Sequence, residues 1–279
     1  MSMRRKIDQH RQSLAEIKEI MYSMKILAYM ETRKLNRFID AQQTVVTSME
    51  NVAGDFLSFY PQTIPELINT IPIYVLIGTE RGFCGGFNHA LVERLDLIRQ
   101  SSDSETSSPI IAVGRKLHGI VDAQESEIIQ LKGASMAEEI YLVLNQLVDK
   151  INDLQSLHNA LEVFCLYHTS QNSVVTQRLL PPFQGQTGNQ QVFPYPPILN
   201  LPPQSLLSEL TDQYLLAEIL SILYTSLMIE NTHRVAHLDG AVNYLEEQSE
   251  ELKRRSNALR QEEIIEEIEV FLLNDTDVV

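Results

Sequence analysis

The residues that could most readily do chemistry are the glycine-rich segment GTERGFCGGFNHA at positions 78–90. It follows a hydrophobic run and precedes a helical pattern, and the backbone amides of such a turn can bind phosphate. However, it lacks the Gly-Lys-Ser/Thr ending of a P-loop, and its glycines do not have the GxGxxG spacing of a dinucleotide site. A tight strand-to-helix turn is therefore the preferred interpretation, with phosphate binding as the alternative.

A second candidate is the histidine pair His233 and His237, whose spacing places two possible metal ligands on one face of a helix. Both fall on outer positions of a heptad pattern and no HExxH motif surrounds them, so a solvated face is the better interpretation. The other histidines are scattered, and no Ser-His-Asp or Cys-His grouping follows from their order. We predict no catalytic residue, no metal site and no cofactor.

The elements around these residues begin with a long heptad pattern over residues 7–59. Two seams of mostly apolar residues define it: Ile7, Leu14, Met21, Ala28, Leu35, Gln42, Met49 and Phe56 on one, and His10, Ile17, Met24, Glu31, Phe38, Val45, Val52 and Phe59 on the other. Pro61 ends it. The pattern predicts one helix of about 80 Å, too long for a compact domain.

A similar heptad pattern covers residues 207–259. Its seams are Leu207, Tyr214, Ser221, Met228, Val235, Val242, Ser249 and Ser256, and Leu210, Ala217, Tyr224, Asn231, Leu238, Leu245, Leu252 and Leu259. A 3.5-residue period kept over this length predicts a left-handed supercoil of the two helices. Because the chain is basic at its start and acidic at its end, an antiparallel pair is favoured. A parallel homodimeric coiled coil or a helical bundle is the alternative.

Between the helices the pattern changes to alternating strands and helices. Strands are expected at 71–77, 110–113, 128–131 and 161–168, and helices at 89–100, 115–123 and 136–157. This order predicts a parallel sheet in a Rossmann-like domain, so the fold class is α/β with a long antiparallel coiled coil. We expect an N-terminal helix at 1–60, the α/β domain at 70–180, a Pro-rich connection at 181–204 and a C-terminal helix at 205–279.

Composition excludes several function classes. The net charge of −15 argues against a nonspecific nucleic-acid binder. No apolar run approaches the roughly 20 residues that cross a bilayer, so membrane association is expected to depend on partners. Cys84 and Cys165 lie far apart and are expected to be reduced thiols of a cytoplasmic protein. The first residues show neither a secretory signal nor a presequence.

Three blocks of the sequence resemble the gamma subunit of F-type ATP synthases. The first helix contains Met24, Lys25 and Ala28, which match the family's Ala-Met-Lys-Met-Val-Ala segment. The glycine segment resembles the family's Asp-Arg-Gly-Leu-Cys-Gly-Gly-Leu-Asn at Arg81, Gly82, Cys84, Gly85, Gly86 and Asn88. The late helix has Glu230 and Arg234, then Asn257, Arg260, Gln261, Ile264 and Glu267, in family-like order.

The resemblance implies a noncatalytic rotor shaft, which couples ion flow through the membrane sector to ATP synthesis or hydrolysis on a ring of alpha and beta subunits. It implies contacts with that ring, with the epsilon subunit and with the membrane c-ring, at the cytoplasmic face of the bacterial plasma membrane. Met24 and Lys25 would lie near the moving beta-subunit lobes, and Arg260, Gln261 and Glu267 would contact the beta subunits near the upper shaft.

The sequence departs from the family pattern at several of these places. Ile265 and Glu266 replace a Thr-Gln pair, Asp239 replaces a lysine, and Tyr29 and Met30 replace alanines. The tail EVFLLNDTDVV replaces a Gly- and Ala-rich ending. A divergent form, such as one from an alternative operon that pumps sodium ions, would account for these changes. A coiled-coil scaffold and a small nucleotide-binding enzyme are the competing interpretations.

Overall fold

The computed structural model describes residues 3–64, 70–101, 108–121, 128–157, 161–170, 173–183 and 194–276 of the 279-residue chain. Side chains of residues 101 and 270–276 are outside this description. The chain forms two compact units. The sheet unit is Tyr29–Arg234, and the terminal unit is Met1–Ala28 together with Val235–Val279. Two helices, α1 (Met3–Phe59) and α5 (Pro203–Thr276), contribute residues to both.

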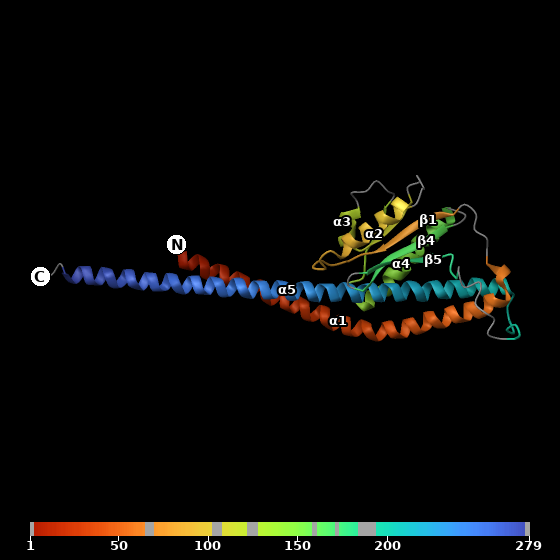
Figure 1. Ribbon diagram of the computed structural model, residues 1–279, viewed down its shortest axis with the longest axis horizontal. Helices are drawn as coiled ribbons and strands as arrows, with labels where there is room; N and C mark the ends of the chain where they lie inside the picture. The colour runs from red at the N-terminus through yellow and green to blue at the C-terminus, as the bar shows by residue number, and fades with distance from the viewer. Residues whose placement is uncertain are drawn as a thin grey trace. The chain divides into compact units, whose positions relative to one another are not determined.

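The sheet unit contains a five-stranded sheet with the order β3-β2-β1-β4-β5; Figure 1 labels three of its strands, β1, β4 and β5. Its strands are β1 (Ile71–Ile77), β2 (Ile110–Val113), β3 (Ile128–Leu131), β4 (Leu161–Ser170) and β5 (Ser173–Leu180). The first four are parallel, and β5 pairs with β4 in the antiparallel direction. Because β2 and β4 flank β1 on opposite sides, the strand order reverses beside β1, which is where α/β folds commonly bind ligands.

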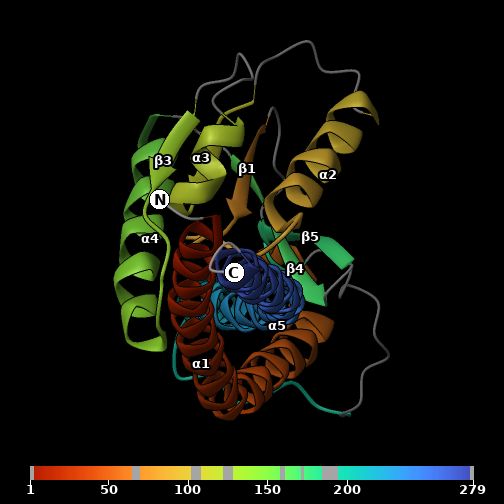
Figure 2. The same cartoon turned by 90° about the vertical axis from the view of Figure 1, so that its left-hand side faces the viewer.

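Helices cover both faces of this sheet, and Figure 2 shows α4 and α2 on opposite sides of the strands. Alternate residues of β1 explain the two layers: Val75 faces α4 (Ile140–Leu157) and α5, while Leu76 faces α2 (Phe87–Ser101) and α3 (Arg115–Val121). Since both faces are buried, the central strands are continuously apolar rather than alternating.

Within the sheet unit, α1 and α5 pack against each other in an antiparallel arrangement. The Phe38 ring stacks on Tyr224 at 5.4 Å between centroids, and Tyr214 Oη donates a 3.5 Å hydrogen bond to Glu50. Near the end of α1, Phe56 and Leu57 share an apolar cluster with the first turns of α5. This intrachain pairing excludes the parallel homodimer as the explanation of the heptads.

The terminal unit has the same antiparallel pairing, here with charged contacts between its two helices. Lys18 Nζ lies 2.8 Å from Glu246 and Lys25 Nζ lies 2.5 Å from Asp239. These ion pairs are one heptad apart on both helices, which fixes the register. The basic start of α1 therefore faces acidic residues of α5, as the charge pattern predicts.

The heptad prediction is correct for both seams of α5 but for only one seam of α1. Residues of the Ile7 seam are at least partly covered, whereas Val45 and Val52 on the other predicted seam are 41% and 57% exposed. The second covered line runs one residue further along: Arg11, Lys18, Lys25, Thr32, Ile39, Val46 and Ala53. Lys18 and Lys25 of this line are polar and pair with Glu246 and Asp239 of α5 through their long side chains, so an apolar pattern could not identify them.

The predicted strands and helices correspond to the structure with small shifts of their ends. The expected helix at 136–157 begins with a 3-10 turn, Ala137–Glu139, before α4. Strand β5 was not predicted, and the sheet is therefore mixed rather than fully parallel. Within the predicted Pro-rich connection, residues 184–193 lie outside the described residues, as do the side chains of the tail beyond 269. The four-part domain division stays a prediction.

Candidate functional site

The glycine-rich segment forms a closed turn between β1 and α2. Asn88 Oδ1 accepts a 3.0 Å hydrogen bond from the Thr79 backbone N–H, and Asn88 Nδ2 donates to Thr79 Oγ1 at 2.9 Å. A Cβ atom added at Gly78 would lie 2.7 Å from Leu117 Cβ, so the glycine permits close packing against α3. The turn is therefore built for close backbone approach, as the preferred interpretation held.

The carboxylate of Glu80 binds backbone N–H groups that follow β2 and β3. It accepts hydrogen bonds from the N–H groups of Arg115 at 3.0 Å and Gly133 at 2.8 Å, and it pairs with the Arg115 guanidinium. Burial raises the pKa of Glu80, but these backbone and side-chain donors outweigh it and lower the pKa overall. Glu80 ties the carboxyl ends of β1, β2 and β3 together, a role that sequence motifs did not indicate.

Helix α5 holds the same turn from the other side through a buried ion pair. Arg234 Nε donates to the Gly82 carbonyl at 3.2 Å, Nη1 donates to Asn231 Oδ1 at 2.6 Å, and Nη2 pairs with Glu230. Both charged residues are at most 5% exposed. Burial raises the pKa of Glu230, while Arg234 and backbone N–H groups of Arg81 and Glu80 oppose that rise.

The other residues of the glycine motif are divided between the interior and the surface. Cys84 is buried beside Arg234, and burial raises the pKa of its thiol to about 12. Gly85 has φ 59° and Phe83 has φ 65°, a conformation unusual for a bulky side chain. Phe83 and Arg81 are exposed, so the turn presents an aromatic and a cationic side chain outward.

The structure corrects the prediction that His233 lies on a solvated face. Its ring meets Phe87 edge-on at 5.5 Å and lies 5.9 Å from the His168 ring, with the Nε2 atom buried. Burial lowers the pKa of His168, and its Nε2 bonds the Phe87 carbonyl at 3.0 Å. His237 is exposed. Across the described residues, no group of at least three His, Cys, Asp or Glu side chains could hold a metal ion.

The five residues expected to contact the catalytic ring all lie in the terminal unit. Arg260, Gln261 and Glu267 are exposed on α5, and Met24 and Lys25 are half-buried on α1. The Lys25 ammonium is engaged by Asp239 Oδ1, and this hydrogen bond, with the nearby carboxylate charge, raises the pKa of Lys25 despite some burial. The structure thus gives Lys25 an intrachain partner, Asp239, which is the residue that replaces a lysine of the family pattern.

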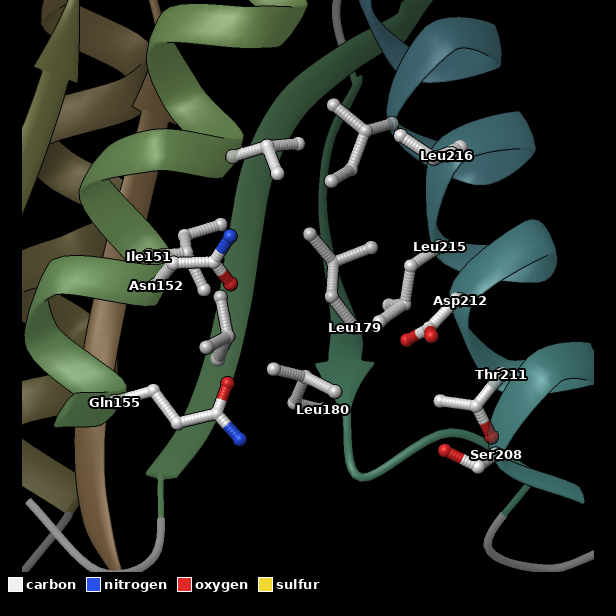
Figure 3. Close-up of a pocket in the computed structure, with 13 residues that line it drawn as sticks. Ile151, Asn152, Gln155, Leu179, Leu180, Ser208, Thr211, Asp212, Leu215 and Leu216 are labelled. Atoms are coloured by element: carbon white, nitrogen blue, oxygen red, sulfur yellow. The ribbon is translucent and has the colours of Figure 1, made fainter. Parts of the chain in front are cut away.

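A groove of about 510 Å³ lies between α4, β4, β5 and the first part of α5 (Figure 3). Its walls are mainly aliphatic, and Asp212 is the one charged side chain among its lining residues. Figure 3 shows Ser208, Thr211 and Asp212 on the α5 side, with Asn152 and Gln155 projecting from α4. The lining offers apolar contact but no pairing of an acid with a base.

A buried polar cluster adjoins this region. Glu218 of α5, 5% exposed, accepts a hydrogen bond from Gln177 Nε2, and Gln177 Oε1 accepts one from Tyr167 Oη at 2.8 Å. Burial raises the pKa of Glu218 to about 7, the Glu50 carboxylate adds to the rise, and the Gln177 bond opposes it. The cluster joins β4, β5 and α5 by hydrogen bonds.

Comparison with known proteins gives consistent matches along the chain. A family profile described as ATP synthase matches residues 3–270. An ATP synthase gamma chain of Clostridium beijerinckii is 28% identical over 276 residues, covering 92% of this chain and 91% of the relative. One from Clostridium botulinum (strain Kyoto / Type A2) is 22% identical over 268 residues, with the same coverage.

Two solved structures share the fold. The rotor of the Euglena gracilis mitochondrial ATP synthase matches with a TM-score of 0.59 and 16% identity, covering 94% of this chain and 98% of that one. A chain of the Tetrahymena thermophila mitochondrial ATP synthase central stalk and c-ring matches with a TM-score of 0.54 and 14% identity, covering 80% and 99%.

The fold and the glycine turn define a class of protein in which two long antiparallel helices pair within one chain that also forms an α/β sheet. Side chains of the same chain, Glu80 and Asn88, make the hydrogen bonds at its glycine-rich turn. The profile match extends over nearly the whole chain and the relatives are matched over most of their length. The chain belongs to the ATP synthase gamma family, and it is a gamma subunit of that complex.

Proposed function

We propose that this gamma subunit is a noncatalytic rotor shaft, which couples rotation driven at a membrane c-ring to conformational change in a ring of alpha and beta subunits. The observation that carries the noncatalytic part is Glu80. Its carboxylate takes the amides of Arg115 and Gly133 beside the strand-order reversal, where an α/β fold would otherwise bind a phosphate. A second anion at that place would meet a negative charge.

The terminal unit is the part proposed to contact the catalytic ring. Apolar side chains exposed on its α1 segment, among them Ile20 and Leu27, are 61% and 64% exposed. Together with Met24 they offer a surface for the moving beta-subunit lobes. Arg260 and Gln261 supply polar contacts from α5, where asymmetric contact would select different states of successive subunits.

The proposed location is the cytoplasmic face of a bacterial plasma membrane. The clostridial relatives support a bacterial setting. Of the helices in the described part of the chain, none is sufficiently long and apolar to span a bilayer. Attachment would then come from contacts with the c-ring and the epsilon subunit.

The experiment that tests the function is co-expression of a tagged chain with the alpha and beta subunits of its own operon, followed by native mass spectrometry. We expect one copy of the chain per alpha–beta ring and ATPase activity that depends on it. The purified chain alone should bind no nucleotide in equilibrium dialysis. A self-dimer without ring partners would favour a scaffold, and nucleotide binding by the chain alone would favour an enzyme.

The contact residues need a separate test because they follow from family resemblance. Alanine at Arg260, Gln261 and Glu267 should lower the ATPase activity of the assembled complex, because it removes the proposed contacts with the ring. The fold should stay intact, since all three side chains are exposed. Alanine at exposed Gln9 and Gln43 on α1 is the control for exposed polar positions outside the proposed contact set. Equal activity of both sets would remove the proposed contacts.

A further inference from the structure

The contacts between α5 and the sheet change in character along the helix. Residues Ile219, Leu223 and Leu227 pack in the apolar cluster on one face of the sheet. Such burial stabilises the unit, but it is non-directional and opposes sliding of the helix only weakly. In a rotor subunit, rotation applies a force that would displace the sheet relative to the shaft helix. Directional contacts such as hydrogen bonds and ion pairs would resist this displacement.

In addition to the Glu218–Gln177 hydrogen bond to β5, α5 makes a group of directional contacts at the end of β1, between Ser226 and Arg234. Ser226 Oγ donates to the Ile77 carbonyl at 3.4 Å, and Arg234 donates to the Gly82 carbonyl at 3.2 Å. Glu230 lies between them, four residues from each, so all three side chains project from one face of the helix. The face is buried, with exposed fractions of 2%, 3% and 5% in chain order.

The turn that these residues hold is itself fixed to the rest of the sheet. Glu80 binds it to Arg115 and Gly133 at the ends of β2 and β3, and Asn88 binds it to the start of α2. A displacement of the turn would therefore move three strand ends and a helix together. Arg234 joins α5 to this rigid set at the Gly82 carbonyl, and Glu230 joins it at the backbone N–H groups of Arg81 and Glu80.

We propose that Glu230, Asn231 and Arg234 form a clasp that fixes α5 to the glycine-rich turn and transmits torque between the sheet unit and the shaft helix. The Arg234 guanidinium is held in place by Asn231 Oδ1 and by the Glu230 carboxylate. These two contacts orient the Nε–H of Arg234 toward the Gly82 carbonyl of the turn. Charge-assisted bonds of this kind are strong and depend on angle, so they resist slippage where apolar packing does not. The inference rests on the proposed rotor function.

A paired substitution separates torque transmission from stability. Removing one member of a buried ion pair leaves an uncompensated charge, whereas replacing both members with apolar residues of similar size is often neutral. We therefore choose Glu230→Leu combined with Arg234→Met in the assembled membrane complex. Arg234→Lys is the second variant, because it keeps the charge beside Glu230 and loses the planar fork that reaches Gly82 and Asn231 together.

The matched control is Glu162→Gln with Arg178→Met, which removes an ion pair between β4 and β5 in the same unit. Hydrogen–deuterium exchange of the complex should show the amides of residues 80–84 exchanging about tenfold faster or more in the clasp variants. ATP-driven ion pumping per ATP hydrolysed should fall roughly twofold or more, and the control should retain the wild-type ratio.

Three results would overturn the clasp. Unchanged exchange in the turn would show that these side chains do not hold it. Faster exchange with a wild-type pumping ratio would show that the turn carries no torque, as would an equal loss of coupling in the control. Failure of the rotor function itself would be distinct, because the wild-type chain would then not assemble with the ring. If the double variant does not assemble, Arg234→Lys decides by the same two measurements.

Discussion

Glu218 shows how one buried carboxyl links the fold to pH. Burial raises its pKa to about 7 from the ordinary value of 4.5, and the Glu50 charge adds to the rise. Below pH 4.5 the group is neutral in both folded and unfolded chains. As pH rises from 4.5 to about 7, the unfolded chain has already lost this proton while the folded chain still holds it, so stability present at low pH is lost between these values.

Glu218→Gln should remove this loss, because the amide cannot ionise and its oxygen can still accept the bond from Gln177. The variant should gain roughly 3 kcal/mol over wild type on going from pH 4.5 to pH 8. Urea unfolding of the purified chain at both pH values measures the difference. Glu209→Gln, at an exposed position of the same helix, is the control and should show no such gain. A pH-independent difference for Glu218→Gln would contradict the assignment.

Gly78 and Gly86 belong to the same turn but have different surroundings. A Cβ at Gly78 would come within 2.7 Å of Leu117, whereas one at Gly86 would meet nothing within 4 Å. Gly78→Ala should therefore cost about 1–3 kcal/mol in the free energy of unfolding, since the residues that the methyl group would meet, Leu117 and Asn88, are both buried. Gly86→Ala should lie within about 0.5 kcal/mol of wild type. Equal effects in urea unfolding would show that the turn can shift to admit the methyl group.

Helix α1 offers a test of the corrected seam in two adjacent valines. Val46 is 3% exposed and Val45 is 41% exposed, although the heptad pattern assigned Val45 to the interior. Val46→Ala should cost about 1–3 kcal/mol of unfolding free energy through the lost burial and the cavity left behind. Val45→Ala should change it by about 0.5 kcal/mol or less. The substitutions alter helix propensity equally, so the difference reports the seam, and the reverse order would restore the original assignment.

The elements that sequence could predict are those with a strong apolar signal. Strand β1 is a continuous apolar run because helices cover both its faces, and both seams of α5 repeat with few interruptions. Strand β5 was missed because only Leu179 of its residues is fully buried and the strand lies at the sheet edge. Its run of β-branched residues, Val174, Val175 and Thr176, was the available signal.

The candidate site was predictable only in part, for a reason that concerns the whole molecule. The glycine pattern identified the turn, but the groups that fix it come from places far away in the chain. Glu80 meets Gly133, and Gly82 meets Arg234, 152 positions later. Likewise, Lys25 meets Asp239 only because the two ends of the chain run antiparallel in the terminal unit. The spacing of residues within a sequence motif cannot predict contacts between residues so far apart in the chain.

The end of α5 gives the last prediction, which concerns the molecule as a working rotor. Arg4, close to the start of α1, pairs with Glu263 at 3.1 Å. Beyond that pair, Ile264, Ile265 and Ile268 are between 45% and 56% exposed, among glutamates. Deletion of residues 265–279 keeps the ion pair and the antiparallel contacts. It should therefore leave the complex assembled while lowering ATP-driven ion pumping, because the exposed tip is lost from the proposed ring contact.

Glu266→Gln with Glu267→Gln separates the tip's charge from its length. If the acidic face binds basic groups of the ring, the double substitution should reproduce part of the pumping defect, and the defect should shrink as salt screens the wild-type contact. If length and apolar contact matter, the double variant should pump normally while the deletion does not. Ion-uptake assays on vesicles, for protons and for sodium, with ATPase rates measured on the same preparations distinguish these outcomes, and normal pumping by the deletion variant would exclude the tip from coupling.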